Sequence, residues 1–168
     1  MTNAAPVEVE VFVSIGSNVR PQENLRRAHE ALSGAYGELQ SSRVYQSQAV
    51  GFEGDDFLNM VVGFHTCEKP QALLTHIEEM HATAKRVRTD NRFSPRTLDV
   101  DLLLYGRMVS QRLKIPHPDI DDYAFVARPL AELAPDLEHP VSGKTMAELW
   151  QGFDRSACPL KCVDIGLN

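Results

Sequence analysis

The sequence predicts an α+β fold in which one antiparallel sheet is covered by helices. Three observations support this prediction: apolar residues alternate with period two in some segments, recur at helical spacing in others, and turn residues separate these segments. The order over the 168 residues is strand, helix, strand, strand, helix, strand, and then a mostly helical tail. We expect a single domain over residues 1–168, because no linker, repeat or low-complexity segment interrupts this order.

The first half of the chain contains three expected strands and one helix. A strand is expected at 7–15, with its valine and isoleucine side chains at odd positions facing the core. A helix begins at Pro21 and stops at Gly37, because proline suits a first helical turn and glycine a helix end. The second and third strands are expected at 39–47 and 57–65.

The second half completes the sheet and adds helices. A second helix opens at Pro70, and a polar loop at 83–97 leads to the fourth strand at 98–105. Further helices are expected at 124–133 and 145–150. This β-α-β-β-α-β order is that of a ferredoxin-like sandwich, here with extra C-terminal helices.

Composition and charge exclude several classes of protein. The hydrophobic share of 43% and the charged share of 24% are typical of a soluble globular domain, and the net charge of −6 argues against nucleic-acid binding. No apolar stretch is long enough to cross a bilayer, and the N-terminus lacks the basic region of a signal peptide. Cys67, Cys158 and Cys162 are expected to be unpaired thiols in a reducing compartment. We therefore expect a cytoplasmic protein with neither nucleic-acid nor membrane partners. A monomer with small-molecule substrates is expected as well, although composition does not indicate either property.

The strongest local pattern is a pair of carboxylates on the fourth expected strand. Asp99 and Asp101 are two residues apart, so period two places both on one face of that strand. The opposite face is expected to consist of Leu98, Val100, Leu102 and Leu104. Paired carboxylates on an apolar strand are costly to bury unless a cation compensates, and Mg²⁺ prefers carboxylate and phosphate oxygens. The alternative is an edge strand whose polar face meets solvent.

A basic loop precedes these aspartates. Its five cations are Lys85, Arg86, Arg88, Arg92 and Arg96. Guanidinium groups match phosphate oxygens, so cations beside two metal-binding carboxylates favour a phosphoryl-transfer site. The alternative is a solvated loop that neutralises surface acids. No P-loop motif is present, so an ATP site must be of another kind.

Two further segments carry candidate binding residues. Phe57 and Asn59 share one face of the third expected strand, where a ring for stacking and an amide for hydrogen bonding suit a flat heterocycle. An asparagine in a strand also commonly satisfies a neighbouring loop. His117 lies between two prolines and is suited either to a nucleotide phosphate or sugar, or to a structural role.

In this order, these elements resemble the 6-hydroxymethyl-7,8-dihydropterin pyrophosphokinases of folate synthesis. The most specific match is PRTLDVD at 95–101, and the resemblance spans residues 9–150. The other matching segments, weak singly but strong in their shared order, are SIGSN at 14–18, VY at 44–45, FLN at 57–59, PH at 116–117 and FVARPLAELAP at 125–135.

The resemblance implies that a diphosphate group moves from ATP to a pterin alcohol and that AMP leaves. It implies two Mg²⁺ ions held by Asp99 and Asp101, with Arg86 and Arg96 as further catalytic residues. The pterin contacts that it implies are Ser47, Val50, Phe57, Asn59, Phe93 and Phe125. The implied ATP contacts are Glu78, Arg86, Arg88, Leu102, Arg112 and His117.

Three departures from the family pattern leave an alternative open. Counting back five positions from the first arginine of the family's Gly-Arg-x-Arg segment gives His81 where the family has an acidic residue. We favour Glu78 for this position, with Glu79 and His81 as alternatives. Tyr123 replaces a family arginine, and the loop at 47–51 lacks the usual prolines. The alternative is a non-catalytic paralogue that binds a pterin or a nucleotide.

Overall fold

The computed structural model describes residues 5–84 and 98–167 of the chain. The expected order of strands and helices is present, which confirms the α+β, ferredoxin-like prediction. The elements are β1 (Val9–Ser17), α1 (Pro21–Tyr36), β2 (Gln40–Ser41), β3 (Val44–Ser47), β4 (Phe57–Thr66), α2 (Pro70–Thr83), β5 (Asp99–Tyr105), α3 (Asp119–Asp122), α4 (Ala124–Leu133), α5 (Met146–Gln151) and β6 (Lys161–Val163).

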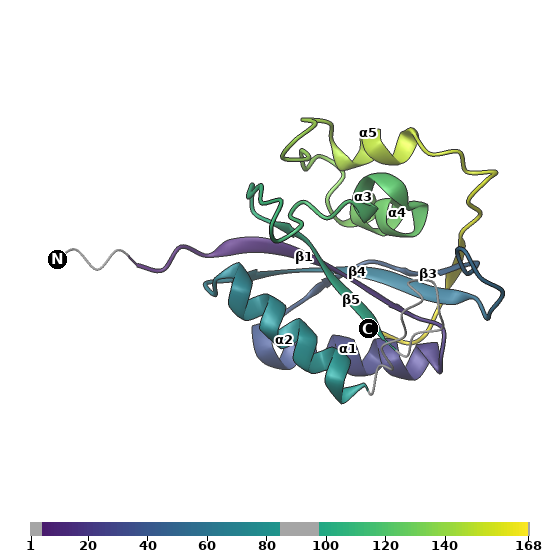
Figure 1. The fold of residues 1–168 in the computed structure, drawn as a ribbon, viewed down its shortest axis with the longest axis horizontal. Coiled ribbons are helices and arrows are strands. Elements are labelled where there is room, and N and C mark those ends of the chain that lie inside the picture. The colour runs from purple at the N-terminus through teal and green to yellow at the C-terminus, as the bar shows by residue number, and fades with distance from the viewer. Residues whose placement is uncertain (1–4, 85–97, 168) are drawn as a thin grey trace.

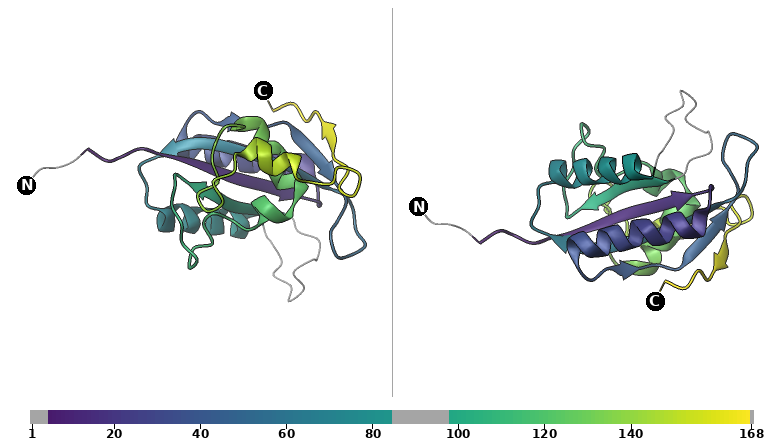
Figure 2. Two further views of the ribbon diagram at one scale, coloured as in Figure 1. Left: turned by 90° about the horizontal axis from the view of Figure 1, so that it is seen from above. Right: turned by 90° about the horizontal axis from the view of Figure 1, so that it is seen from below.

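The sheet forms the middle layer of the molecule. Its strand order is β5-β1-β4-β3-β6, with β2 also paired to β4, and every pair is antiparallel. Helices α1 and α2 cover one face, whereas α3, α4 and α5 lie over the other (Figure 1). The view from below shows α1 and α2 side by side beneath the strands (Figure 2). The extra C-terminal helices therefore add a third layer to the sandwich.

Both faces of the sheet are buried, so β1 contributes side chains to two cores. Val11, Val13 and Ile15 pack with α1 and α2, as expected for the odd positions. Phe12 was expected on the face away from the core, but it is 1% exposed and packs in the second core with α4. The prediction was wrong here because the C-terminal helices cover the face that a two-layer sandwich would expose. Val7 lies before the strand and is exposed.

A bulge in β5 changes which face its leucines occupy. Phe12 pairs with Leu104 and Val13 pairs with Leu102, so Leu103 is an extra residue in β5. Leu102 therefore packs in the core beside α1 and α2, whereas Leu103 and Leu104 pack in the core beneath α4. The expectation that Leu104 shares a face with Leu102 was wrong, because strict alternation ends at the bulge.

A second register change splits the strand that was expected at 39–47. Ser41 pairs with Val62, but Tyr45 pairs with Asn59, so one additional residue lies between β2 and β3. The side chain of Ser42 satisfies one backbone group there, because its Oγ accepts a hydrogen bond from the Val61 N–H at 2.9 Å. The single expected strand is therefore two short strands.

Two short elements were not expected from the sequence. Helix α3 has four residues, and β6 adds three residues to the edge of the sheet beside β3. The three cysteines are exposed and free, as expected. Within residues 5–84 and 98–167, no helix combines the length and the apolar character that a membrane span requires.

Candidate active site

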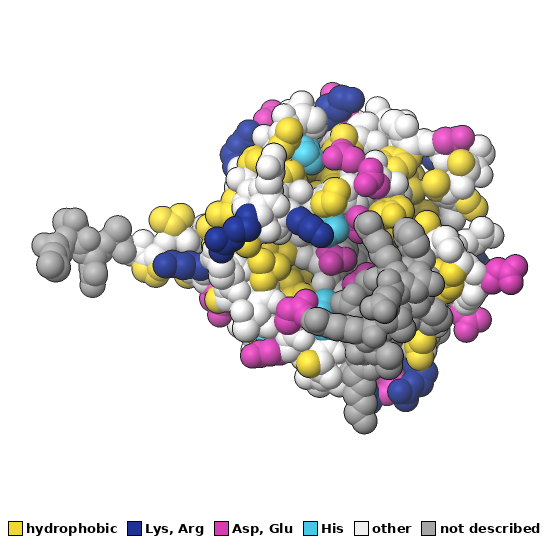
Figure 3. All heavy atoms as spheres, in the orientation of Figure 1, with side chains coloured by type: hydrophobic (Ala, Val, Ile, Leu, Met, Phe, Trp, Pro, Cys, Tyr) yellow, Lys and Arg dark blue, Asp and Glu magenta, His cyan; other side chains and the backbone are white. Residues whose placement is uncertain are grey.

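A cavity of about 420 Å³ opens between the sheet and the C-terminal helices. It brings together residues from β1, β3, β4, β5, α4 and the segments before α3 and β4. Acidic, histidine and hydrophobic side chains gather on the corresponding side of the surface (Figure 3). The residues expected from the sequence that line this cavity are Ser47, Val50, Phe57, Asn59, Asp99, Asp101, His117 and Phe125.

The two aspartates enter the cavity from β5. Asp99 pairs with Gly16 and Asp101 pairs with Ser14 across β1, so both carboxylates lie on the sheet face that α4 covers. Both residues are half-buried. Two carboxylates on one rigid strand, at the wall of one cavity, form a suitable pair of oxygen donors for a hard divalent cation.

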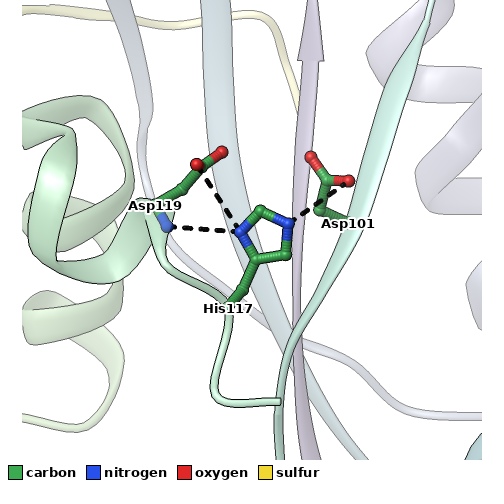
Figure 4. Close-up of side chains that lie close together, drawn as sticks. All are labelled: Asp101, His117 and Asp119. Atoms are coloured by element: carbon green, nitrogen blue, oxygen red, sulfur yellow. Dashed lines mark hydrogen bonds and ion pairs between the residues drawn. The ribbon is translucent and has the colours of Figure 1, made fainter. Parts of the chain in front are cut away.

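His117 lies between Asp101 and Asp119 (Figure 4). Its Nε2 is 3.9 Å from Asp101 Oδ1, and its Nδ1 is 3.6 Å from Asp119 Oδ1. The His117 N–H donates to the carbonyl oxygen of Leu103 at 2.9 Å, which fixes the loop against β5. Ligand atoms of the three side chains lie within 4.8 Å of one another, so a cation at Asp101 would have His117 and Asp119 beside it. Sequence reasoning missed Asp119, two positions after the histidine.

Asn59 is held in a fixed orientation on β4. Its Nδ2 donates to Ser47 Oγ at 2.8 Å and to the Tyr45 carbonyl oxygen at 3.4 Å. A carbonyl oxygen can only accept, so the amide nitrogen must face β3. The amide oxygen then lies toward Gly16, where a Cβ would be 3.0 Å from it. Asn59 therefore satisfies a neighbouring strand and also presents an acceptor at the cavity.

Two stacked aromatic rings form part of the opposite wall. The rings of Tyr123 and Phe125 have centroids 5.0 Å apart and an interplanar angle of 16°. Both residues line the cavity, and Phe125 is in the first turn of α4. The tyrosine that replaces the family arginine is therefore part of the wall, where it supports the ring expected to stack on the substrate.

Three expected ATP contacts lie outside the cavity lining. Leu102 packs in the core beside α1 and α2, and Arg112 is exposed. Glu78 is 56% exposed and contacts His81, whose Nδ1 is 3.3 Å from Glu78 Oε1. The buried His81 in turn accepts a hydrogen bond from the Val100 N–H through Nε2 at 2.9 Å. His81 thus connects α2 to the strand that carries the aspartates. The expected contacts of Leu102, Arg112 and Glu78 with ATP stay predictions.

A lysine that was not expected lies at the cavity. Among the residues that the structure describes, Lys114 is the only basic residue, lysine or arginine, that lines the cavity. Its backbone has a positive φ of 54°. Its position in the 110–115 turn, before the rigid Pro116, gave no signal in the sequence. The expected contacts Arg86, Arg88, Phe93 and Arg96 fall outside the described residues.

Comparisons with known proteins show the family to which this chain belongs. Residues 12–135 match the family model described as 7,8-dihydro-6-hydroxymethylpterin-pyrophosphokinase (HPPK). The chain belongs to the HPPK family. It is 38% identical to a 2-amino-4-hydroxy-6-hydroxymethyldihydropteridine pyrophosphokinase of Synechocystis over 150 residues, which are 86% of this chain and 76% of that protein. The same-named protein of Pseudomonas aeruginosa is 35% identical over 164 residues, which are 92% of this chain and 94% of that one.

Solved structures support the fold. A crystal structure titled HPPK-DHPS in complex with substrates aligns with 90% of this chain at a TM-score of 0.69 and 12% identity. A Plasmodium falciparum HPPK-DHPS bound to pteroate aligns with 89% at a TM-score of 0.68 and 12% identity. The HPPK chain described here spans 44% of each of those longer proteins. The family resemblance drawn from the sequence is thus confirmed.

Proposed function

We propose that this HPPK chain transfers the diphosphate group of ATP to the hydroxymethyl group of 6-hydroxymethyl-7,8-dihydropterin. The observation that supports this proposal is that one cavity contains both carboxylates suited to a metal ion and aromatic and amide groups suited to a heterocycle. The carboxylates of Asp99 and Asp101 suit the metal-bound phosphates of ATP, while the rings of Phe57 and Phe125 and the amide of Asn59 suit a flat heterocycle. The cavity volume of about 420 Å³ is that of a small-molecule site.

The pterin fits the end of the cavity formed by β3, β4 and α4. The ring of Phe125 offers a stacking face, backed by Tyr123. Asn59 uses its amide nitrogen on Ser47 and Tyr45, so its oxygen accepts a hydrogen bond from a ring or amino N–H of the pterin. Recognition by a fixed acceptor distinguishes a pterin from a ring of similar shape without the N–H donor.

The phosphates fit the end formed by β5 and the 114–119 segment. Asp99 and Asp101 would hold two Mg²⁺ ions, which when bound neutralise the charge of the triphosphate. His117 is held by Asp119 and the Leu103 carbonyl oxygen, so its ring has a defined position beside Asp101. The ammonium of Lys114 adds a positive charge at the cavity wall. Arg86, Arg88 and Arg96 are proposed as further phosphate contacts.

The arrangement supports an in-line displacement at the β-phosphorus. The pterin hydroxymethyl oxygen forms a bond to the β-phosphorus and its proton is released to solvent, while the bond from this phosphorus to the α,β-bridging oxygen breaks. AMP leaves with that oxygen. The protein contributes chiefly by positioning the two substrates and by balancing charge, as is general for phosphoryl transfer.

Replacement of the metal-binding carboxylates tests this proposal. Asp99→Asn and Asp101→Asn should each lower AMP release in the presence of pterin by at least about a hundredfold, because both remove a charge that holds Mg²⁺. Asp122→Asn on α3 is a matched control, because Asp122 is exposed and outside the cavity. Turnover within about threefold of wild type in either cavity variant, with unfolding temperatures unchanged, would contradict the assignment.

The second candidate is a pterin-binding paralogue without transfer activity. The observation in its favour is that an aromatic ring, Tyr123, occupies a cavity position where the family has an arginine. Pterin binding without AMP formation would select this alternative. The single-domain organisation, the monomeric state and the cytoplasmic location are retained as proposals from the sequence.

A further inference from the structure

Helix α4 carries a further residue of the FVARPLAELAP segment that the proposed chemistry does not use, the acidic residue Glu132. Glu132 is seven residues after Phe125, which is close to two helical turns, so both side chains project from the same side of α4. The rise between them is about 10.5 Å. One end of this helix therefore forms the wall of the cavity, and the other end carries a carboxylate toward the sheet.

The Glu132 carboxylate binds strand β3 and the residue before it through three hydrogen bonds. Its Oε1 accepts from the Arg43 backbone N–H at 2.9 Å and from Arg43 Nε at 3.2 Å. Its Oε2 accepts from the hydroxyl of Tyr45 at 2.5 Å. Tyr45 is 4% exposed, and the Glu132 side chain is 23% exposed. The hydrogen bond from Tyr45 is thus partly shielded from water, which strengthens it, whereas the Arg43 side chain is 55% exposed and its ion pair is that of a surface group.

The charge state of this contact is well defined. Burial raises the pKa of Glu132, but hydrogen bonds from Tyr45 and Arg43 and the charge of Arg43 together lower it below 4.5. Burial, followed by the hydrogen bond to Glu132, raises the pKa of Tyr45 above 10.0. At neutral pH the pair is therefore a carboxylate that accepts from a phenol, which is a strong type of hydrogen bond.

The position of Glu132 matches the interruption between β2 and β3. Because of the register change, the Arg43 N–H lies outside the regular hydrogen-bond pattern between β4 and its neighbouring strands. Glu132 accepts a hydrogen bond from this N–H instead. From this point β3 runs directly into the cavity: Tyr45 pairs with Asn59, and Ser47 pairs with Phe57. The Tyr45 carbonyl oxygen and the Ser47 hydroxyl are also the acceptors that orient the Asn59 amide.

Helix α4 lacks one of its internal hydrogen bonds, so its contacts with neighbouring elements contribute to holding it in place. Pro129 lies inside the helix and has no N–H to donate to the carbonyl oxygen of Phe125, four residues earlier. A fixed contact at the last turn limits how far α4 can move relative to β3.

We propose that Glu132 is a positioning residue for pterin binding. Glu132 fixes the separation of α4 and β3, so that Phe125 can stack on the pterin ring while Asn59 accepts a hydrogen bond from it. This inference rests on the proposed function. Glu132 contacts Tyr45 and Arg43 and does not line the cavity, so it acts through these residues.

The experiment compares Glu132→Gln and Tyr45→Phe with wild type and with the control Glu138→Gln. Glu138 is an exposed acid that forms an ion pair with Arg107 at 3.6 Å, and neither residue lines the cavity. Each test variant should raise KM for the pterin by at least about tenfold, which is near the lower end of the effect of disturbing one hydrogen bond to a charged group. KM for MgATP should stay within about twofold, because the phosphate end of the cavity is built by other elements.

The double variant makes the test specific to the shared contact. Glu132→Gln with Tyr45→Phe should raise the pterin KM by less than the product of the two single effects, since both changes weaken the same hydrogen bond between Tyr45 and Glu132. A lower unfolding temperature with an unchanged pterin KM in both single variants would overturn the inference and leave Glu132 a purely structural residue. Tyr45→Phe keeps its buried ring, so it provides the answer should Glu132→Gln fail to fold.

Direct pterin binding in the presence of a non-hydrolysable ATP analogue separates this inference from the proposed function. Weaker pterin binding in both variants, together with a wild type that forms no AMP, would retain the positioning role and refute the transfer reaction. Normal wild-type turnover with unchanged pterin binding in both variants would refute the positioning role and retain the reaction.

Discussion

The substitution Gly16→Ala tests how the cavity orients the Asn59 amide, which is proposed to bind the pterin. A Cβ at this position would lie 3.0 Å from Asn59 Oδ1 and 3.8 Å from the Leu58 carbonyl oxygen. Because the first distance is shorter than ordinary van der Waals contact, the Asn59 amide must shift by a few tenths of an ångström. That shift acts on a buried side chain whose hydrogen bond to Ser47 is 2.8 Å long.

The size of the effect follows from this hydrogen bond. Weakening one intramolecular hydrogen bond costs about 0.5–1.5 kcal/mol, which corresponds to a loss of about 2- to 12-fold in pterin affinity if the amide no longer meets the substrate correctly. The same cost lowers the unfolding temperature of a domain of this size by about 1–6 °C. The binding of an ATP analogue should be unchanged, because its contacts are proposed at the other end of the cavity.

Calorimetric titration with the pterin, in the presence of a non-hydrolysable ATP analogue, measures the first quantity, and a thermal melt measures the second. Gly34→Ala is the matched control: Gly34 is an exposed residue of α1 with no atom within 4 Å of an added Cβ. This control should raise the free energy of unfolding by about 0.5–1 kcal/mol without affecting ligands. Unchanged pterin affinity in Gly16→Ala would refute the role given to the Asn59 oxygen.

Three further predictions concern the aromatic wall, the packing of the sheet and the response to acid. Phe125→Ala should weaken pterin binding by about 5- to 150-fold through lost stacking, whereas Phe153→Ala, which removes a ring outside the cavity, should leave it unchanged in the same titration. Gly63→Ala places a Cβ 2.8 Å from the Phe12 ring. It should therefore lower the free energy of unfolding, measured by denaturant titration, by about 1–3 kcal/mol. A smaller loss would mean that the ring moves freely. Burial raises the pKa of Glu132 and its hydrogen bonds lower it by more, so its stabilising contribution is complete above pH 4.5 and is lost as the pH falls through the folded-state value. The melting-temperature difference between wild type and Glu132→Gln should therefore be full at neutral pH and shrink in acid, and a difference independent of pH would contradict this.

The sequence predicted those site residues whose positions depend on local periodicity. Asp99 and Asp101 share a face because a short strand alternates, and Phe57 and Asn59 follow the same rule on β4. Period two holds only while the register holds, however. Leu104 was misplaced because the bulge in β5 depends on how this strand pairs with β1.

The features that sequence reasoning missed depend on contacts between distant segments. The strand expected at 39–47 is interrupted at a point where Glu132, 89 residues after Arg43, accepts a backbone hydrogen bond. Asp119 and Lys114 reach the cavity because the segment after β5 folds back over the sheet, which local spacing does not indicate. The third layer of helices likewise buried Phe12, although alternation alone placed it on the face away from the expected core.

Product analysis after mixing the protein with MgATP and 6-hydroxymethyl-7,8-dihydropterin tests the central claim most directly. The account predicts pterin diphosphate and AMP in equal amounts by mass spectrometry, because attack at the β-phosphorus transfers two phosphoryl groups and releases the third with adenosine. ADP with a monophosphorylated pterin would contradict the proposed pose of ATP. Bound pterin without any product would contradict the transfer reaction itself.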